Sequence, residues 1–75
     1  MRKINEIAYD IKKNWKKVSV HAAPYLEAMF FLSSIDENYG YDSGREVVSR
    51  FLCNASSFRG PEARRIKSEL REMLK

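Results

Sequence analysis

The chain has 75 residues, 44% hydrophobic and 12% aromatic, with a formal net charge of +4, and this composition excludes a fully disordered chain. The longest apolar run, residues 28–32, is far short of the roughly 20 residues that a membrane-spanning helix needs, and the single cysteine, Cys53, excludes an internal disulfide. We therefore expect one small domain over residues 1–75, in a reducing cytoplasm and without a membrane segment.

Two helices are predicted in the first half of the chain. Apolar residues at steps of three or four predict an amphipathic helix over residues 3–17, with lysines that suit the helix dipole near its end. A second helix follows over residues 23–34, because Pro24 is favourable in a first turn. This segment is apolar nearly all round, which predicts a central helix with neighbours on two or three faces. The alternative is that one of its faces docks on another chain.

A loop and a third helix come next. Asp, Asn and Gly residues predict the loop over residues 36–42. Ser43 and Glu46 have the spacing of a capping box, in which each side chain reaches the other residue's backbone N–H, at the start of a helix over residues 43–55. Gly44 lies on the inward stripe of this helix, where it would let another helix approach closely.

The last helix is predicted over residues 61–74. Pro61 suits its first position, Glu62 suits its N-terminal dipole, and Arg65 and Glu69 have the spacing of an i,i+4 ion pair. The four segments together predict an all-α fold, a compact four-helix single domain. The predicted core consists of Ile7, Ile11, Trp15, Leu26, Met29, Phe30, Val48, Phe51, Leu52, Ile66 and Leu70.

Charge is distributed unevenly along the chain. Residues 1–18 hold six Lys/Arg against two acids, residues 19–44 hold four acids and no Lys or Arg, and residues 45–75 hold eight Lys/Arg against four acids. Basic ends can form an electrostatic surface for a polyanion. The alternative, which we favour slightly, is that the basic ends fold onto the acidic middle.

Residues suited to catalysis or metal binding are few. His21 and Cys53 are the only histidine and cysteine, and we interpret them as a turn residue and a buried inert thiol. The acidic residues of segment 36–42 lack the spacing of a calcium loop, so we interpret that segment as solvated. We expect no enzyme activity, no catalytic residue, no metal site and no cofactor.

Two binding functions remain, and the first is protein binding. Tyr39 and Tyr41 flank Gly40 in an acidic loop, and exposed tyrosines are good interface anchors. The candidate interface residues are Asp36, Glu37, Tyr39 and Tyr41. Their alternative interpretation is that both tyrosines lie back on the core. Self-association into a homodimer through the face of the second helix is also compatible with the sequence.

The second binding function is nucleic-acid recognition by the basic first and last helices. Residues 54–60 are the only junction that could serve as the turn of a helix-turn-helix, with the last helix then reading the groove. The candidate contacts are Lys12, Lys13, Lys16, Lys17, Arg59, Arg64 and Arg65. A solvated basic face is the alternative, and we favour it over nucleic-acid binding.

The stretches "INEIAYDIKKNW", "APYLEAMFFLSSIDENYGYDSGREVV" and "FLCNASSFRGPEARRIKSELREML" resemble a group of short, functionally uncharacterised proteins of prophages and mobile elements of Gram-positive bacteria. The resemblance covers nearly the whole chain. It implies a cytoplasmic accessory role in the life cycle of a phage or element, with a host or phage protein as partner and nucleic acid as the alternative. It assigns no site residues.

Overall fold

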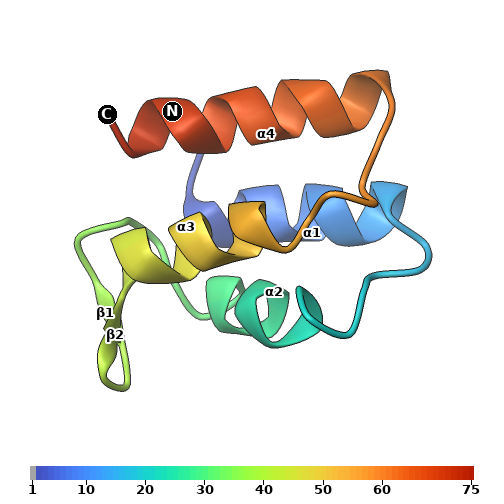
Figure 1. The fold of residues 1–75 in the computed structure, drawn as a ribbon. Helices are drawn as coiled ribbons and strands as arrows, with labels where there is room; N and C mark the ends of the chain where they lie inside the picture. Colours follow the sequence, from blue (N-terminus) through green and yellow to red (C-terminus); the bar gives the residue numbers. More distant parts are fainter. Residues whose placement is uncertain (1) are drawn as a thin grey trace.

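The structure is a computed structural model that describes residues 2–75. Its elements in chain order are α1 (Ile4–Asn14), α2 (Ala23–Met29), β1 (Asn38–Tyr39), β2 (Asp42–Ser43), α3 (Gly44–Cys53) and α4 (Pro61–Met73). The predicted four helices are confirmed, but the all-α prediction misses the small antiparallel β1–β2 sheet. Figure 1 shows α4 along one side of the molecule, α1 and α3 in the middle, and α2 on the opposite side.

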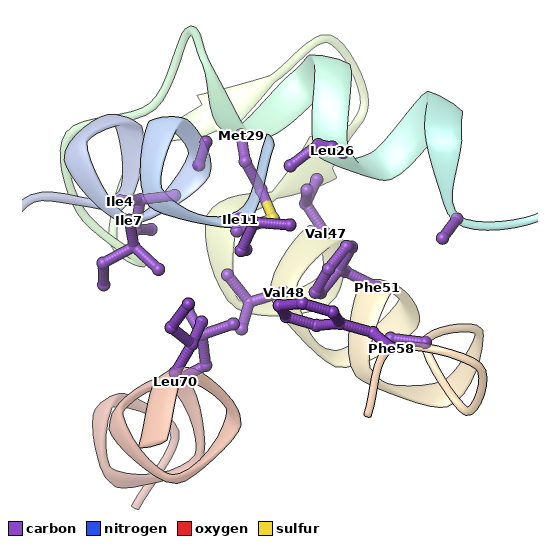
Figure 2. Close-up of a cluster of buried hydrophobic side chains, with 14 of the residues drawn as sticks. Ile4, Ile7, Ile11, Leu26, Met29, Val47, Val48, Phe51, Phe58 and Leu70 are labelled. Carbon is purple, nitrogen blue, oxygen red and sulfur yellow. The ribbon is translucent and has the colours of Figure 1, made fainter. Parts of the chain in front are cut away.

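One hydrophobic core lies between the helices, and Figure 2 shows its side chains converging from all four of them. Nine of the eleven predicted core residues are buried, but Phe30 and Leu52 are only half-buried at its edge. Phe58, from the connection between α3 and α4, is buried and stacks on Trp15 with ring centroids 5.0 Å apart. The buried residues are Ile4, Ile7, Ala8, Ile11, Trp15, Ala22, Leu26, Ala28, Met29, Leu32, Val47, Val48, Phe51, Ala55, Phe58, Ala63, Ile66 and Leu70.

Helix α2 ends at Met29, five residues earlier than predicted, because the following segment caps α1. The backbone N–H groups of Ile4 and Asn5 donate to the carbonyl oxygens of Ser33 and Leu32, at 3.1 and 2.9 Å. The first N–H groups of a helix have no acceptor within it, so an acceptor from elsewhere in the chain stabilises the start of α1. The consequence is that the chain after α2 leaves the helix and lies across the N-terminus of α1.

Gly44, at the start of α3, lies beneath the loop that precedes the sheet, and not beneath another helix as predicted. A Cβ atom here would lie 2.7 Å from the carbonyl oxygen of Ser34 and 2.9 Å from the Cα of Ile35. The N–H of Gly44 donates to the carbonyl of Glu37 at 2.6 Å, which holds this loop on the helix. The predicted capping box is present in one half only: the Ser43 hydroxyl accepts from the backbone N–H of Glu46 at 3.1 Å, whereas the Glu46 carboxylate lies 3.7 Å from Arg50.

A network of four ion pairs lies between the N-terminal segment and α4, and two of its pairs, Arg2–Glu69 and Arg65–Asp10, join the two directly. Arg2 lies 2.9 Å from Asp10 and 2.6 Å from Glu69, and Arg65 lies 3.1 Å from Asp10 and 2.8 Å from Glu62. The predicted Arg65–Glu69 pair is therefore wrong, because Glu69 is bound by Arg2. Burial by itself raises the pKa of Asp10, but the hydrogen bonds from Arg2 and Arg65 outweigh it and leave that pKa lowered. The pKa of Glu69 is lowered chiefly by its hydrogen bond from Arg2.

Candidate protein-binding surface

The segment predicted as a solvated loop forms a short hairpin in its second half. Asn38 pairs with Ser43 and Tyr39 with Asp42, so Gly40 and the residue after it make the turn. Gly40 has a φ of +64°, and glycine in the first of two central turn positions is the pattern of a type II′ turn. This turn suits the twist of paired strands, which explains why so short a segment pairs at all.

Aromatic side chains of α1, of the end of α2 and of this hairpin define what we call the aromatic surface: Tyr9, Phe30, Phe31, Tyr39 and, projecting from the turn without a ring contact, Tyr41. The ring centroids of Tyr9 and Phe30 are 4.9 Å apart, and those of Phe31 and Tyr39 are 5.8 Å apart. Phe31 is 73% exposed, Tyr9 is 69% exposed, and Tyr41 at the hairpin turn is fully exposed. Contiguous exposed apolar side chains of this kind mark interaction sites, whereas single ones do not.

An open hollow lies in the aromatic surface, between the end of α2 and the outer side of α1. Its lining consists of Tyr9, Lys12, Glu27, Phe30 and Phe31. The Lys12 ammonium lies 5.8 Å from the centre of the Phe30 ring, a cation–π distance. The hollow therefore combines aromatic walls with one cation and one anion at its edge, a composition suited to an amphipathic segment of a partner.

The acids of the middle of the chain make no ion pair with another described residue. None of the ion pairs within residues 2–75 includes any of the four acids of residues 19–44 (Glu27, Asp36, Glu37 and Asp42). We expected the basic ends of the chain to pair with its acidic middle, and the ion pairs show that this is wrong. Arg2 and Arg65 instead pair with acids that lie in the basic end segments themselves. The carboxylates of these four acids are therefore not neutralised by an ion pair within the described residues.

The structure separates the four predicted interface residues. Tyr39 and Tyr41 belong to the aromatic surface, and neither is packed into the core. The carboxylate of Glu37 accepts the backbone N–H of Ser33 at 2.7 Å, which is a structural role. Asp36 lines a different hollow, between the N-terminus of α1 and the C-terminus of α4.

Three members of the aromatic surface were not predicted as site residues. Phe30 was predicted as core and Phe31 as part of an all-round apolar helix, and Tyr9 carries no signal of its own in the sequence. The signal for Phe30 and Phe31 was that residues 23–34 are apolar on more sides than one helix needs for its own core. Phe31, just after the end of α2, is the exposed member of this segment, and the alternative that a face of it docks on another chain stays a prediction.

The predicted nucleic-acid contacts lie in different parts of the structure. Lys12 belongs to the hollow of the aromatic surface, and the other three predicted lysines are exposed at the end of α1 and in the connection after it. Arg65 is held in ion pairs with Asp10 and Glu62. Arg59 and Arg64 are exposed near the start of α4 and make none of the ion pairs among residues 2–75.

The geometry of a helix-turn-helix is not present at residues 54–60. That motif needs a turn of three or four residues between helices that cross at about 90–120°. Here the connection takes all the residues between Cys53 and Pro61, and α3 and α4 run in opposite directions along the molecule (Figure 1). The helix-turn-helix on which the groove-reading role of α4 rests is therefore absent, and nucleic-acid binding by this helix stays a prediction.

Cys53 is exposed, so the prediction of a buried thiol is wrong. It comes two positions after the fully buried Phe51, which places it on the outer side of α3. His21 is exposed in the connection between α1 and α2. The described residues 2–75 contain no group of three or more His, Cys, Asp or Glu side chains placed to hold a metal ion.

Comparison of the chain with protein-family models, with curated proteins and with solved structures gave no match. The resemblance to short prophage proteins thus stays a prediction. Across residues 2–75, no helix combines the length and the apolar character that crossing a membrane requires.

Proposed function

We propose that this chain is a non-enzymatic protein-binding domain, whose aromatic surface binds an apolar segment of a partner protein that also carries Lys or Arg. The observation that supports it best is two pairs of ring contacts, Tyr9–Phe30 at 4.9 Å and Phe31–Tyr39 at 5.8 Å, whose central members are consecutive residues lining one hollow. Aromatic anchors of this kind supply most of the energy of small interfaces, because they bury a large area at low entropic cost.

The carboxylates beside the rings favour basic groups on the partner, and Lys12 offsets the charge of Glu27 only within the hollow itself. Glu27 lines the hollow, and Asp42 is the cross-strand partner of Tyr39 in the hairpin. Neither carboxylate is in an ion pair within the described part of the chain. Complementary charges at the rim of an interface raise the association rate and exclude wrong partners. In the prophage setting that the sequence resemblance implies, the partner is a host or phage protein.

A random-peptide library tests this function without a known partner. Peptides selected on the wild-type chain should combine large apolar residues with Lys or Arg. Phe31→Ser and Tyr41→Ala should each weaken the binding of a selected peptide at least about tenfold, because each removes an exposed anchor without opening the core. The matched control is Val20→Ala, which trims a residue that is 79% exposed but outside the aromatic surface.

Three results would contradict the proposal. Selected peptides rich in Asp and Glu, or bound equally well by the Phe31→Ser chain, would show that another surface binds. A concentration-dependent dimer in sedimentation velocity that Phe31→Ser converts to a monomer would assign the aromatic surface to a second copy of this chain.

A further inference from the structure

We propose that a second surface, on the α3 side of α4, binds the phosphate backbone of a nucleic-acid duplex. This surface, which we call the basic flank, consists of Arg45, Arg59, Arg64, Lys67 and Arg71. It differs from the predicted nucleic-acid site in two ways. It adds Arg45, Lys67 and Arg71, and it omits Arg65 and the four predicted lysines of residues 12–17. It also goes beyond the proposed protein binding, which uses other residues.

The two flanks of α4 have different charge patterns. The flank toward α1 carries Glu62, Arg65 and Glu69, which are neutralised in the ion pairs described above. Arg64, Lys67 and Arg71 occupy the other flank, at the i, i+3 and i+7 positions that share one side of a helix. Over these seven residues the helix rises about 10 Å, so the three cations form one row.

The Lys67 ammonium lies close to two other cations of the basic flank, Arg71 and Arg59. The pKa of Lys67 is lowered by burial first and then by the positive charges of Arg71 and Arg59. Its ammonium donates to the carbonyl of Phe58 at 2.6 Å and lies over that ring, so the side chain is held in place. No ion pair among residues 2–75 involves Arg59, Arg64, Lys67 or Arg71. An anion would relieve this repulsion.

Arg45 of α3 extends the row at its far end. Its guanidinium donates to the carbonyl of Leu74 at 2.5 Å, at the end of α4, and is exposed. Arg59 precedes the helix at the other end, and its Nε donates to the carbonyl of Ser56 at 3.3 Å. Both guanidiniums keep further N–H groups for an anion, because arginine has five. The basic flank thus follows the length of α4 and ends in an arginine on either side.

The chemistry of this surface favours nucleic acid over a lipid membrane or an acidic protein. A membrane-binding surface needs exposed apolar side chains beside its cations, and the large exposed ones among residues 2–75 (Tyr9, Val20, Phe31, Tyr39 and Tyr41) all lie outside the basic flank. A protein interface is depleted of charge at its core. Protein–nucleic acid interfaces are polar and strongly positive, as this surface is.

Fluorescence anisotropy with a labelled mixed-sequence DNA duplex tests the inference. Four phosphate contacts predict a loss of roughly 100-fold in affinity between about 50 and 200 mM salt. Arg64→Glu/Arg71→Glu should abolish binding, and Arg71→Gln should lower the slope of log affinity against log salt by about one. The matched control is Lys13→Glu/Lys16→Glu, which changes the net charge equally at exposed residues outside the basic flank and should keep most of the affinity.

The inference is overturned if the two double variants lose affinity equally, because net charge alone would then explain binding. It is also overturned if the wild-type chain binds the duplex no better than it binds polyglutamate, or if vesicles of anionic phospholipid bind it more tightly than DNA does. Circular dichroism of both double variants checks that the helices are intact, since all four substituted side chains are exposed.

Discussion

The substitution Gly44→Ala tests how residues 34–37, which join Phe31 to the hairpin of the aromatic surface, are held on α3. The new methyl group would lie inside 3.0 Å of two backbone atoms, in Ser34 and Ile35, that no side-chain rotation can move away. That loop is fixed by hydrogen bonds from Gly44 to the carbonyl of Glu37 and from Arg45 to that of Ile35, at 2.6 and 3.1 Å. Overpacking of this kind costs about 1–3 kcal/mol, whereas the better helix propensity of alanine returns at most about 1 kcal/mol.

The expected net loss is about 1–2 kcal/mol, which corresponds to a fall in Tm of about 4–16 °C for a domain of this size. Thermal unfolding followed by circular dichroism measures it, with Ser49→Ala as the control at a half-exposed position of the same helix. Ser49→Ala should change the unfolding free energy by less than about 0.5 kcal/mol. If Gly44→Ala is as stable as the wild-type chain, the described approach of the loop to α3 is refuted.

Two further predictions concern the core and the ion pairs between α1 and α4. Phe51→Ala removes the largest fully buried side chain and should cost about 3–5 kcal/mol, close to the whole stability of so small a domain; a normal urea transition would show that Phe51 is not in the core. Asp10 and Glu69 have folded-state pKa values below the ordinary 3.8 and 4.5, so the stability that they contribute is present above pH 4.5 and is lost as pH falls below it. Because the arginine partners are partly exposed, we expect that loss to be about 1 kcal/mol or less, and Asp10→Asn to reduce it, as measured by urea unfolding at stepwise lower pH.

The helices were predictable because each has a sufficient apolar stripe of its own. Examples are the pair Ile7 and Ile11 in α1 and the pair Ile66 and Leu70 in α4. The members of each pair are four residues apart, so they share one face of the helix, and all four are buried. The end of α2 was not predictable in this way, since it depends on hydrogen bonds to Ile4 and to the residue after it, which are distant in sequence. The two-residue strands are too short to show any alternation of side chains.

The candidate site was predictable only in part. Tyr39 and Tyr41 stand out because a glycine between two tyrosines in an acidic segment indicates an exposed turn. Tyr9 and Phe31 belong to the same surface only because α1 and the end of α2 lie side by side, which is a tertiary effect. Arg65 was predicted to contact nucleic acid, but its guanidinium is bound by Asp10. This ion pair could not be predicted, because the two residues are 55 positions apart in the chain.

The most direct test of the proposed function is an NMR titration of the isotopically labelled chain with a selected peptide that combines apolar and basic residues. We predict that the NMR signals of Tyr9, Phe31, Tyr39 and Tyr41 shift on binding. The signals of Val20 and of the basic flank should not shift. Shifts confined to Arg64, Lys67 and Arg71, with the aromatic signals unchanged, would contradict it.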